Sequence, residues 1–207
     1  SDPVKAISNN FNSALHVLEW ARKTDTPVVF SGSSTVHHGL WGSPYAWSKY
    51  AGEQLCELYT KVYELPTAIC RFYNVYGEHQ LEDGAYATVV GIFEKQYREG
   101  KALTVTGNGE QRRDFTHIDD IVDGIVRCGF NLFGDNPISS GQAYELGRGK
   151  NYSIIEITEM FGQAEVEYIP ARKGEYPFTL ADYTKANEEL GWNPILDIKD
   201  YLHDIVK

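Results

Sequence analysis

The chain has 207 residues, 42% of them apolar and 23% charged, which is the composition of a folded globular protein and not of a disordered one. Aspartate and glutamate number 29 against 19 lysines and arginines, so the formal net charge is −10 at pH 7. A surface of this sign repels polyphosphate chains. It excludes general nucleic-acid binding but still allows a small phosphorylated ligand held by a few arginines.

The first third of the chain alternates helix and strand signals. Apolar residues recur at three- and four-residue steps over residues 8–24, which predicts a helix. The apolar run at 27–31 predicts a strand buried on both faces, and a Gly/Ser loop follows it at 31–44. A second long helix is expected over 45–65 and another buried strand over 66–77. This order predicts a parallel sheet with crossover helices.

Beyond residue 77 the alternation is less regular. Ser153 and Glu156 form an S-x-x-E capping box at the start of a helix, and Gly191 stands where a helix C-terminus favours glycine. The other predicted elements are helices at 86–99, 118–130, 182–190 and 196–206, strands at 102–106 and 143–147, and a half-buried strand at 164–170. The change of pattern divides the chain into residues 1–77 and 78–207.

The cysteines and the hydropathy bear on the cellular compartment of the protein and on whether it holds disulfides or a metal. Cys56, Cys70 and Cys128 are widely spaced, with no C-x-x-C and no histidine pair beside them. We therefore expect reduced thiols and no metal site. The first residues lack a signal pattern, and no stretch has the length of a membrane span. These features predict a cytoplasmic protein that does not bind a membrane.

One pair of residues has the spacing of an acid/base site. Tyr45 and Lys49 form a Y-x-x-x-K at the start of a predicted helix, so phenol and ammonium lie on one helical face. A lysine in this position is expected to lower the pKa of the phenol. Tyr97 and Lys101 have the same spacing, but Gly100 interrupts the helix between them. Only the first pair follows a predicted strand end with clustered hydroxyls, where parallel sheets bind ligands.

Five motifs occur in a family-specific order: VVFSGSSTV, SPYAWSKYAGE, RFYNVYG, GNGEQRRDFTHIDDIVDGI and TLADYTKANEELGW. Together they resemble the extended short-chain dehydrogenase/reductase family, and within it the UDP-glucose 4-epimerase-like enzymes. The resemblance runs over essentially the whole chain. It implies an α/β fold, with part of a doubly wound parallel (Rossmann-like) sheet in residues 1–77. Residues 78–207 would form a smaller mixed α/β substrate-binding domain with some returning sheet elements.

The resemblance assigns roles at the expected active site. Ser33, with Ser34 as the alternative, matches the catalytic hydroxyl, and Tyr45 matches the acid/base tyrosine. Lys49 matches the lysine that binds the nicotinamide ribose of NAD. Phe72 and Tyr73 match positions that pack the nicotinamide end, so Tyr45, Lys49, Phe72 and Tyr73 are the expected cofactor contacts.

Substrate contacts follow in the same way. Ser33, Asn74, Arg113 and Arg172 match residues that bind the sugar or its diphosphate, for which a guanidinium fork is well suited. Other interpretations stay open: Asn74 as the cap of a turn, and the two arginines as surface ion pairs. Two loop histidines, His37 and His38, are either a proton relay or substituted loop residues.

The chain also departs from the family pattern. No G-x-G-x-x-G fingerprint for NAD precedes the first motif, although the family has one. The segment YELGRGKNY mimics that fingerprint but carries Tyr152 in place of its third glycine, and it matches the substrate domain. We consider three explanations: a separate chain that supplies the N-terminal half, truncation, or a natural remnant. The segment between Ser33 and Tyr45 is also shorter than usual, which leaves the sugar undetermined.

The resemblance implies an NAD-dependent nucleotide-sugar epimerase that oxidises the sugar transiently. The alternatives are a dehydratase or reductase of the same family and a non-catalytic nucleotide-sugar binding or assembly remnant. Dehydratases carry an acidic pair beside the hydroxyl, which Ser33 lacks. The two long helices at 8–24 and 45–65 match those through which the family dimerises, so a homodimer is expected. We expect this chain alone to turn over no substrate.

Overall fold

The computed structural model describes residues 2–37, 39–84, 87–134, 137–171 and 176–207. These residues form two compact units, each assembled from three separate stretches of the chain. Each unit has its own paired strands and its own hydrophobic core. Unit 1 comprises Ser1–Phe72, Val122–Leu146 and Asp182–Asn193, and unit 2 comprises Tyr73–Ile121, Gly147–Ala181 and Pro194–Lys207.

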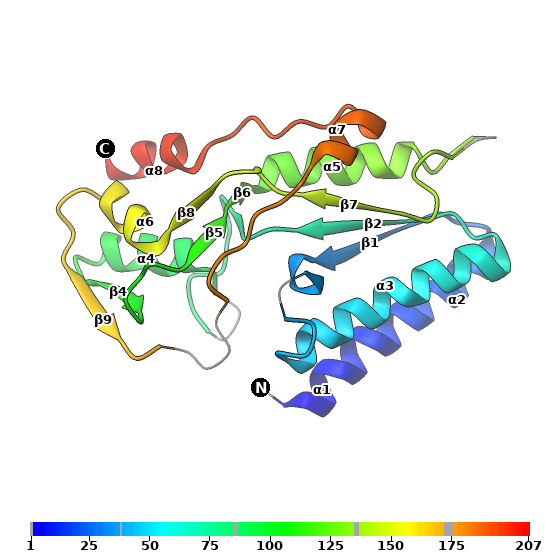
Figure 1. Ribbon diagram of the computed structural model, residues 1–207, viewed down its shortest axis with the longest axis horizontal. Coiled ribbons are helices and arrows are strands. Elements are labelled where there is room, and N and C mark those ends of the chain that lie inside the picture. Colours follow the sequence, from blue (N-terminus) through cyan, green and yellow to red (C-terminus); the bar gives the residue numbers. More distant parts are fainter. Residues whose placement is uncertain (1, 38, 85–86, 135–136, 172–175) are drawn as a thin grey trace. The chain divides into compact units, whose positions relative to one another are not determined.

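Unit 1 is built on a three-stranded parallel sheet (Figure 1). The strands lie in the order β1 (Val28–Ser33), β2 (Thr67–Phe72) and β7 (Gln142–Leu146). The predicted parallel arrangement is therefore confirmed. The prediction that residues 27–31 are buried on both faces is wrong. Val28, Val29 and Phe30 are only half-buried, because β1 is an edge strand of this sheet and has a neighbour on one side only.

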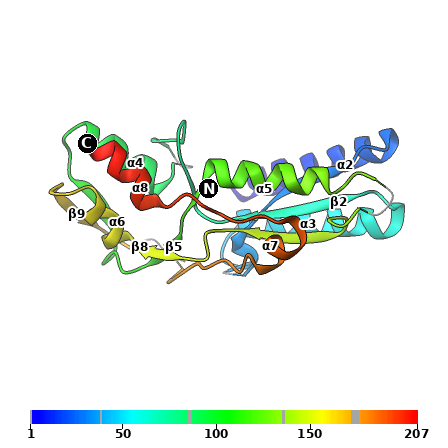
Figure 2. The same cartoon turned by 90° about the horizontal axis from the view of Figure 1, so that it is seen from above.

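Helices cover both faces of this sheet (Figures 1 and 2). On one face lie α2 (Ser13–Thr24) and α3 (Pro44–Tyr63), and on the other α5 (Ile118–Phe130) and α7 (Thr184–Leu190). The helix predicted over 8–24 begins earlier, because α1 (Pro3–Ile7) and a π-helical turn (Ser8–Asn12) run into α2. Asp2 caps this longer helix by accepting from the Val4 and Lys5 N–H groups at 3.0 and 3.2 Å.

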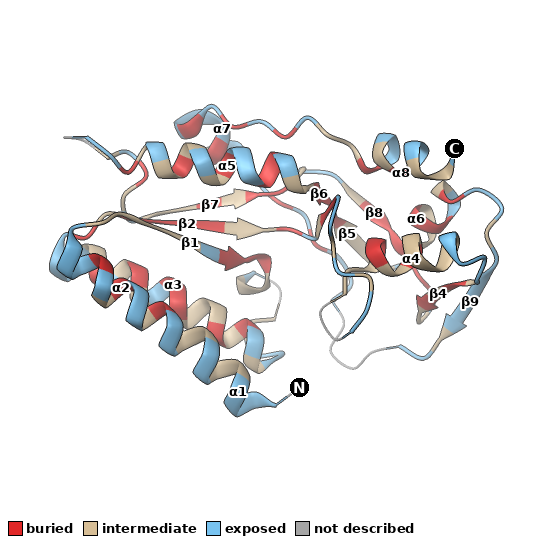
Figure 3. Cartoon of the chain, turned by 180° about the vertical axis from the view of Figure 1, so that it is seen from behind, coloured by how far each residue is buried: buried red, intermediate tan, exposed pale blue. Residues whose placement is uncertain are grey.

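The core of unit 1 lies between the sheet and the helix pair α2 and α3. Figure 3 shows buried residues on the inner sides of these helices and exposed residues on their outer sides. This is the amphipathic pattern that the three- and four-residue steps predict. The buried cluster consists of Leu18, Ala21, Cys56, Tyr59, Leu65 and Ile69.

Unit 2 is a mixed α/β unit with short strands. Two pairs are parallel and one is antiparallel: β3 (Val75–Tyr76) with β6 (Thr116–His117), β4 (Leu103–Thr106) with β9 (Val166–Ile169), and β5 (Arg112–Asp114) with β8 (Asn151–Ser153). Its helices include α4 (Val89–Arg98), α6 (Ile154–Met160) and α8 (Ile198–Val206). Their core contains Val90, Phe93, Leu103, Val105, Ile157 and Phe161 among its buried side chains.

Local signals at the element ends are mostly confirmed. Ser153 and Glu156 form both hydrogen bonds of a capping box at the start of α6. Gly191 ends α7 with φ 63°, a left-handed conformation that favours glycine. The strand expected at 164–170 is less buried than predicted, since Tyr168 on β9 is 59% exposed.

A buried carboxylate organises the interior of unit 2. Asp114 is fully buried and accepts hydrogen bonds from the backbone N–H groups of Arg148, Gly149 and Ala181, at 2.7, 2.9 and 3.0 Å. These three donors come from two stretches of chain that are far from Asp114 in the sequence. The side chain therefore holds three segments of unit 2 together.

Candidate active site

Ser33 stands at the end of β1, where the chain turns into a short 3₁₀ helix (Ser34–Val36). Its Oγ accepts from the backbone N–H of Thr35 at 3.3 Å and from the Thr35 hydroxyl at 3.0 Å. The side chain is buried, and its hydroxyl lies near enough to the phenol of Tyr45 to lower the pKa of that phenol. Of the two candidate hydroxyls, Ser33 is the one with this effect on the tyrosine.

The first two turns of α3 carry Tyr45 and Lys49. The Ser43 hydroxyl accepts from the Ala46 N–H at 3.1 Å, and Pro44 is the first helical residue, so α3 begins just before Tyr45. Tyr45 keeps 44% of its surface exposed. The ammonium of Lys49 donates to the Ser31 carbonyl of β1 at 2.8 Å.

The electrostatics of the pair differ from the expectation that Lys49 lowers the phenol pKa. Partial burial of the ring raises the pKa of Tyr45, and the nearby Ser33 hydroxyl opposes this rise. The Lys49 ammonium is engaged with the Ser31 carbonyl instead. Burial lowers the pKa of Lys49, and the nearby carboxylate of Glu53 opposes that shift.

Phe72 and Tyr73 fall in different units. Phe72 ends β2, is half-buried and pairs in register with Ser33 of β1. Tyr73 is completely buried in unit 2, with its ring against Gly147. A Cβ at Gly147 would lie 3.0 Å from this ring, so the glycine permits the close packing of Tyr73.

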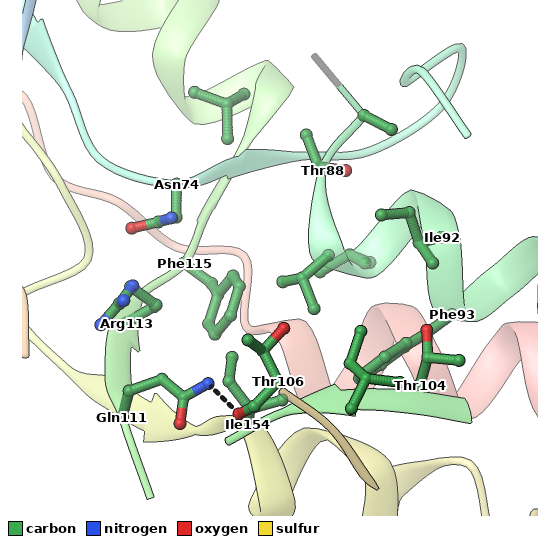
Figure 4. Close-up of a pocket in the computed structure, with 15 residues that line it drawn as sticks. Asn74, Thr88, Ile92, Phe93, Thr104, Thr106, Gln111, Arg113, Phe115 and Ile154 are labelled. Atoms are coloured by element: carbon green, nitrogen blue, oxygen red, sulfur yellow. Dashed lines mark hydrogen bonds between the residues drawn. The ribbon is translucent and has the colours of Figure 1, made fainter. Parts of the chain in front are cut away.

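Unit 2 contains a pocket of about 340 Å³ that brings Asn74 and Arg113 together (Figure 4). Figure 4 shows their side chains on one side of the pocket with Gln111, and Ile92 and Phe93 on the other. The lining also includes residues to which no sequence motif assigned a role: Thr88, Thr104, Thr106, Gln111 and Phe115. Gln111 and Phe115 lie within the same motif as Arg113, which was the available signal for them.

The two adjacent arginines of β5 have different surroundings. Arg112 donates to the side chain and carbonyl of Asn151 at 2.8 and 3.0 Å and pairs with Glu156 at 2.8 Å. Arg113 lines the pocket and donates to the Arg112 carbonyl at 2.8 Å. Successive side chains of a strand point to opposite faces, which separates their roles. Asn74 accepts from the Thr179 hydroxyl at 3.3 Å.

Some candidates lie outside the described residues, namely Arg172 and His38. Within the described part of the chain, no group of three or more His, Cys, Asp or Glu side chains is arranged to hold a metal ion. In the same part, no helix has the length and apolar character required to cross a membrane.

Comparison with known proteins identifies the family of the chain. Residues 1–131 match the model of the NAD dependent epimerase/dehydratase family. The chain belongs to this family. An uncharacterised UDP-glucose epimerase of Bacillus subtilis is 30% identical over 212 residues, which cover 94% of this chain and 64% of that protein. The chain thus spans slightly less than two thirds of this relative.

Solved structures of family members share the fold. A UDP-glucose 4-epimerase of Thermotoga maritima, determined with UDP-glucose, matches with a TM-score of 0.87 and 27% identity, covering 99% of this chain and 70% of that one. A UDP-glucuronic acid 4-epimerase of Bacillus cereus, determined with UDP-glucuronic acid and NAD, matches with a TM-score of 0.84 and 29% identity, covering 97% and 68%. The Rossmann-like fold expected from the sequence motifs is confirmed.

Proposed function

We propose that this chain carries the acid/base and nucleotide-binding groups of an NAD-dependent nucleotide-sugar 4-epimerase. The observation that carries the proposal is the placement of the Ser33 hydroxyl at the end of β1, where it lowers the pKa of the Tyr45 phenol, with Lys49 one turn further along α3. A phenol beside a hydroxyl at a parallel strand end is suited to take a proton from a sugar hydroxyl.

The residues of unit 1 have complementary parts in this chemistry. Tyr45 takes the proton of the sugar hydroxyl, and Ser33 donates a hydrogen bond to the oxygen as it becomes a carbonyl. Because the pKa of Tyr45 is raised, the base form requires stabilisation, and Ser33 is the group that favours it. NAD, when bound, supplies the acceptor and donor of hydride.

The donor set of unit 1 fits the nicotinamide ribose. A lysine ammonium has three N–H donors, and the bond from Lys49 to Ser31 uses one of them. The other donors suit ribose hydroxyls. Phe72, half-buried at the neighbouring strand end, offers an apolar surface for the nicotinamide ring. We assign these contacts to the cofactor as proposals, and we retain Tyr73 as a proposed cofactor contact on the sequence motif alone.

Unit 2 is the proposed nucleotide-sugar unit. Its pocket combines a guanidinium, an amide and apolar side chains, which suit diphosphate, sugar and base respectively. In a chain of net charge −10, Arg113 supplies the local positive charge that a diphosphate needs. Asn74 is proposed to contact the diphosphate, and we also retain Arg172 as a proposed substrate contact on the sequence motif alone.

The dehydratase alternative differs from an epimerase in the groups expected around the Ser33 hydroxyl. A dehydratase needs an acidic group there, but the side chain that donates a hydrogen bond to Ser33 Oγ is the hydroxyl of Thr35, which favours epimerisation. A non-catalytic binding subunit would retain nucleotide-sugar affinity without turnover. Since the sequence has no dinucleotide fingerprint, we propose that turnover requires a further dinucleotide-binding segment, from this protein or another chain.

Two surfaces of unit 1 are the proposed binding sites of partners. The outer side of the helix pair exposes Val17 and Trp20 of α2 and Leu58 and Val62 of α3. Apolar side chains gathered on paired helices are typical of association surfaces, so we propose a homodimer through α2 and α3. The outer edge of β1 is the proposed attachment site of the dinucleotide-binding segment.

Calorimetric titration of the purified chain with UDP-glucose and UDP-glucuronic acid tests the function. We expect binding of at least one of them, and Arg113→Gln to weaken it about 10- to 100-fold, since a charge-assisted hydrogen bond contributes roughly 1.5–3 kcal/mol. Arg98→Gln on α4, whose side chain is 61% exposed, is the matched control and should bind normally. Equal affinity of the Arg113 variant and the wild type, or no binding of either ligand by the wild type, would contradict the proposal.

The same preparation tests the requirement for a further segment. Incubated with NAD and UDP-glucose, the chain alone is expected to form no 4-epimer, because its sequence has no glycine-rich fingerprint to hold the NAD pyrophosphate. Chromatographic separation of the two epimers after prolonged incubation is the measurement. Accumulation of the epimer in a NAD-dependent manner would show that the chain is sufficient by itself.

A further inference from the structure

A row of charged side chains crosses the sheet of unit 1 one residue before the strand ends. Gly32 of β1, Arg71 of β2 and Glu145 of β7 are paired in register. Gly32 leaves room for Glu53 of α3, since a Cβ at this glycine would lie 2.6 Å from the Glu53 Oε1 atom. Glu53 is almost completely buried and accepts from Arg71 Nε and Nη2 at 3.1 and 2.8 Å through its Oε2.

His37 completes the row between Arg71 and Glu145. Its Nε2 lies 2.6 Å from Glu145 Oε1 and 3.4 Å from Arg71 Nη1. A 2.6 Å contact requires a proton between the two atoms, and a carboxylate has none to give, so the imidazole donates from Nε2. The other Glu145 oxygen accepts from the Asp182 N–H at 2.8 Å, which holds the carboxylate in place.

The side chains of this row fix the positions of two elements, the segment that follows Ser33 and the helix α3 that carries Tyr45. His37 ends the short 3₁₀ helix that begins immediately after Ser33, and its N–H donates to the Ser34 carbonyl at 3.0 Å. The segment is therefore fixed at one end by β1 and at the other by Glu145. On α3, Glu53 lies one turn beyond Lys49 on the same helical face.

We propose that Glu53, Arg71, His37 and Glu145 form a positioning network, in which the hydrogen bond between His37 and Glu145 fixes the segment after Ser33 and thereby the place of the Ser33 hydroxyl beside Tyr45. The network rests on the proposed function for its catalytic meaning, because that function gives Ser33 and Tyr45 their roles. Of the two interpretations of His37 from the sequence, relay or substituted loop residue, neither describes this role. Its Nε2–H group is engaged with Glu145, and this hydrogen bond fixes the geometry of the segment.

The effect of Ser33 on the Tyr45 phenol can be observed without turnover. Replacing Tyr45 by 3-fluorotyrosine acidifies the phenol and provides one fluorine signal whose shift follows its ionisation. Since the Ser33 hydroxyl lowers the phenol pKa, Ser33→Ala should raise it. We expect His37→Gln to raise it in the same direction. The double variant should titrate no higher than Ser33→Ala, because both changes remove one and the same interaction.

His16→Gln, an exposed histidine of α2, is the matched control and should titrate like the wild type. An unchanged or lowered phenol pKa in His37→Gln, or additive shifts in the double variant, would overturn the proposal. Glu145→Gln removes the charge from the opposite side of the pair and must reproduce the result, including if His37→Gln fails to fold. The titration uses no substrate, so its outcome is independent of whether the chain binds nucleotide sugars.

Discussion

Asp114→Ala is expected to lower the free energy of unfolding by about 3–5 kcal/mol, because it leaves three buried backbone N–H groups without their acceptor. These donors belong to Arg148, Gly149 and Ala181, at 2.7 to 3.0 Å from the carboxylate. Asp114→Asn keeps one acceptor oxygen and should lower the free energy of unfolding by less. Urea denaturation followed by circular dichroism measures both.

Glu167→Ala on the exposed strand β9 is the control for loss of a carboxylate in the same unit. It should change the free energy of unfolding by no more than about 0.5 kcal/mol. If Asp114→Ala were as mild as this control, the three hydrogen bonds would not stabilise unit 2, and the carboxylate would require another explanation.

Glu53→Ala is expected to destabilise unit 1 by about 2–4 kcal/mol. Breaking a buried ion pair costs roughly 3–5 kcal/mol, and the side chain of Arg71, 22% exposed, regains part of this through contact with water. The Arg71 guanidinium otherwise remains at the sheet without the carboxylate that accepts its hydrogen bonds. Thermal and urea unfolding of the variant give the magnitude.

The double substitution Glu53→Leu with Arg71→Met separates the ion pair from the packing. Apolar side chains of similar volume avoid the unpaired charge, so this variant should recover most of the stability that Glu53→Ala loses. The double substitution removes the positioning network, however, and should raise the phenol pKa of Tyr45 as His37→Gln does. If it were as unstable as Glu53→Ala, packing at the site of Gly32 would be the dominant contribution, and the ion pair a minor one.

Much of unit 1 could be predicted because its signals are local. The apolar steps of residues 8–24 and 45–65 and the apolar runs after Thr26 and Leu65 are complete within each element. The capping box at Ser153 likewise needs only neighbouring residues. The strand predicted over 66–77 is divided into β2 and β3 in the structure. Strands β5, β6 and β8 were missed because two or three residues are too short for periodicity, and their pairing partners lie far away in the sequence.

Some features of the candidate site could likewise be predicted from local sequence, and others depend on tertiary packing. The helical spacing of Tyr45 and Lys49 is a property of the sequence, as is the place of Ser33 after a predicted strand. The engagement of Lys49 with Ser31 depends on how α3 packs on β1, and it accounts for the error about the phenol pKa. The separation of Arg112 from Arg113 depends on which face of β5 meets the pocket.

The sequence by itself determined the family, the parallel sheet and the helix that presents Tyr45, because ordered motifs and periodicity are encoded over short distances. Only the tertiary structure decided that His37 reaches Glu145 across more than a hundred residues, and that Gly32 leaves room for Glu53. Contacts of this kind arise from strand register and helix packing. They join residues that are far apart in the sequence, so no local pattern specifies them.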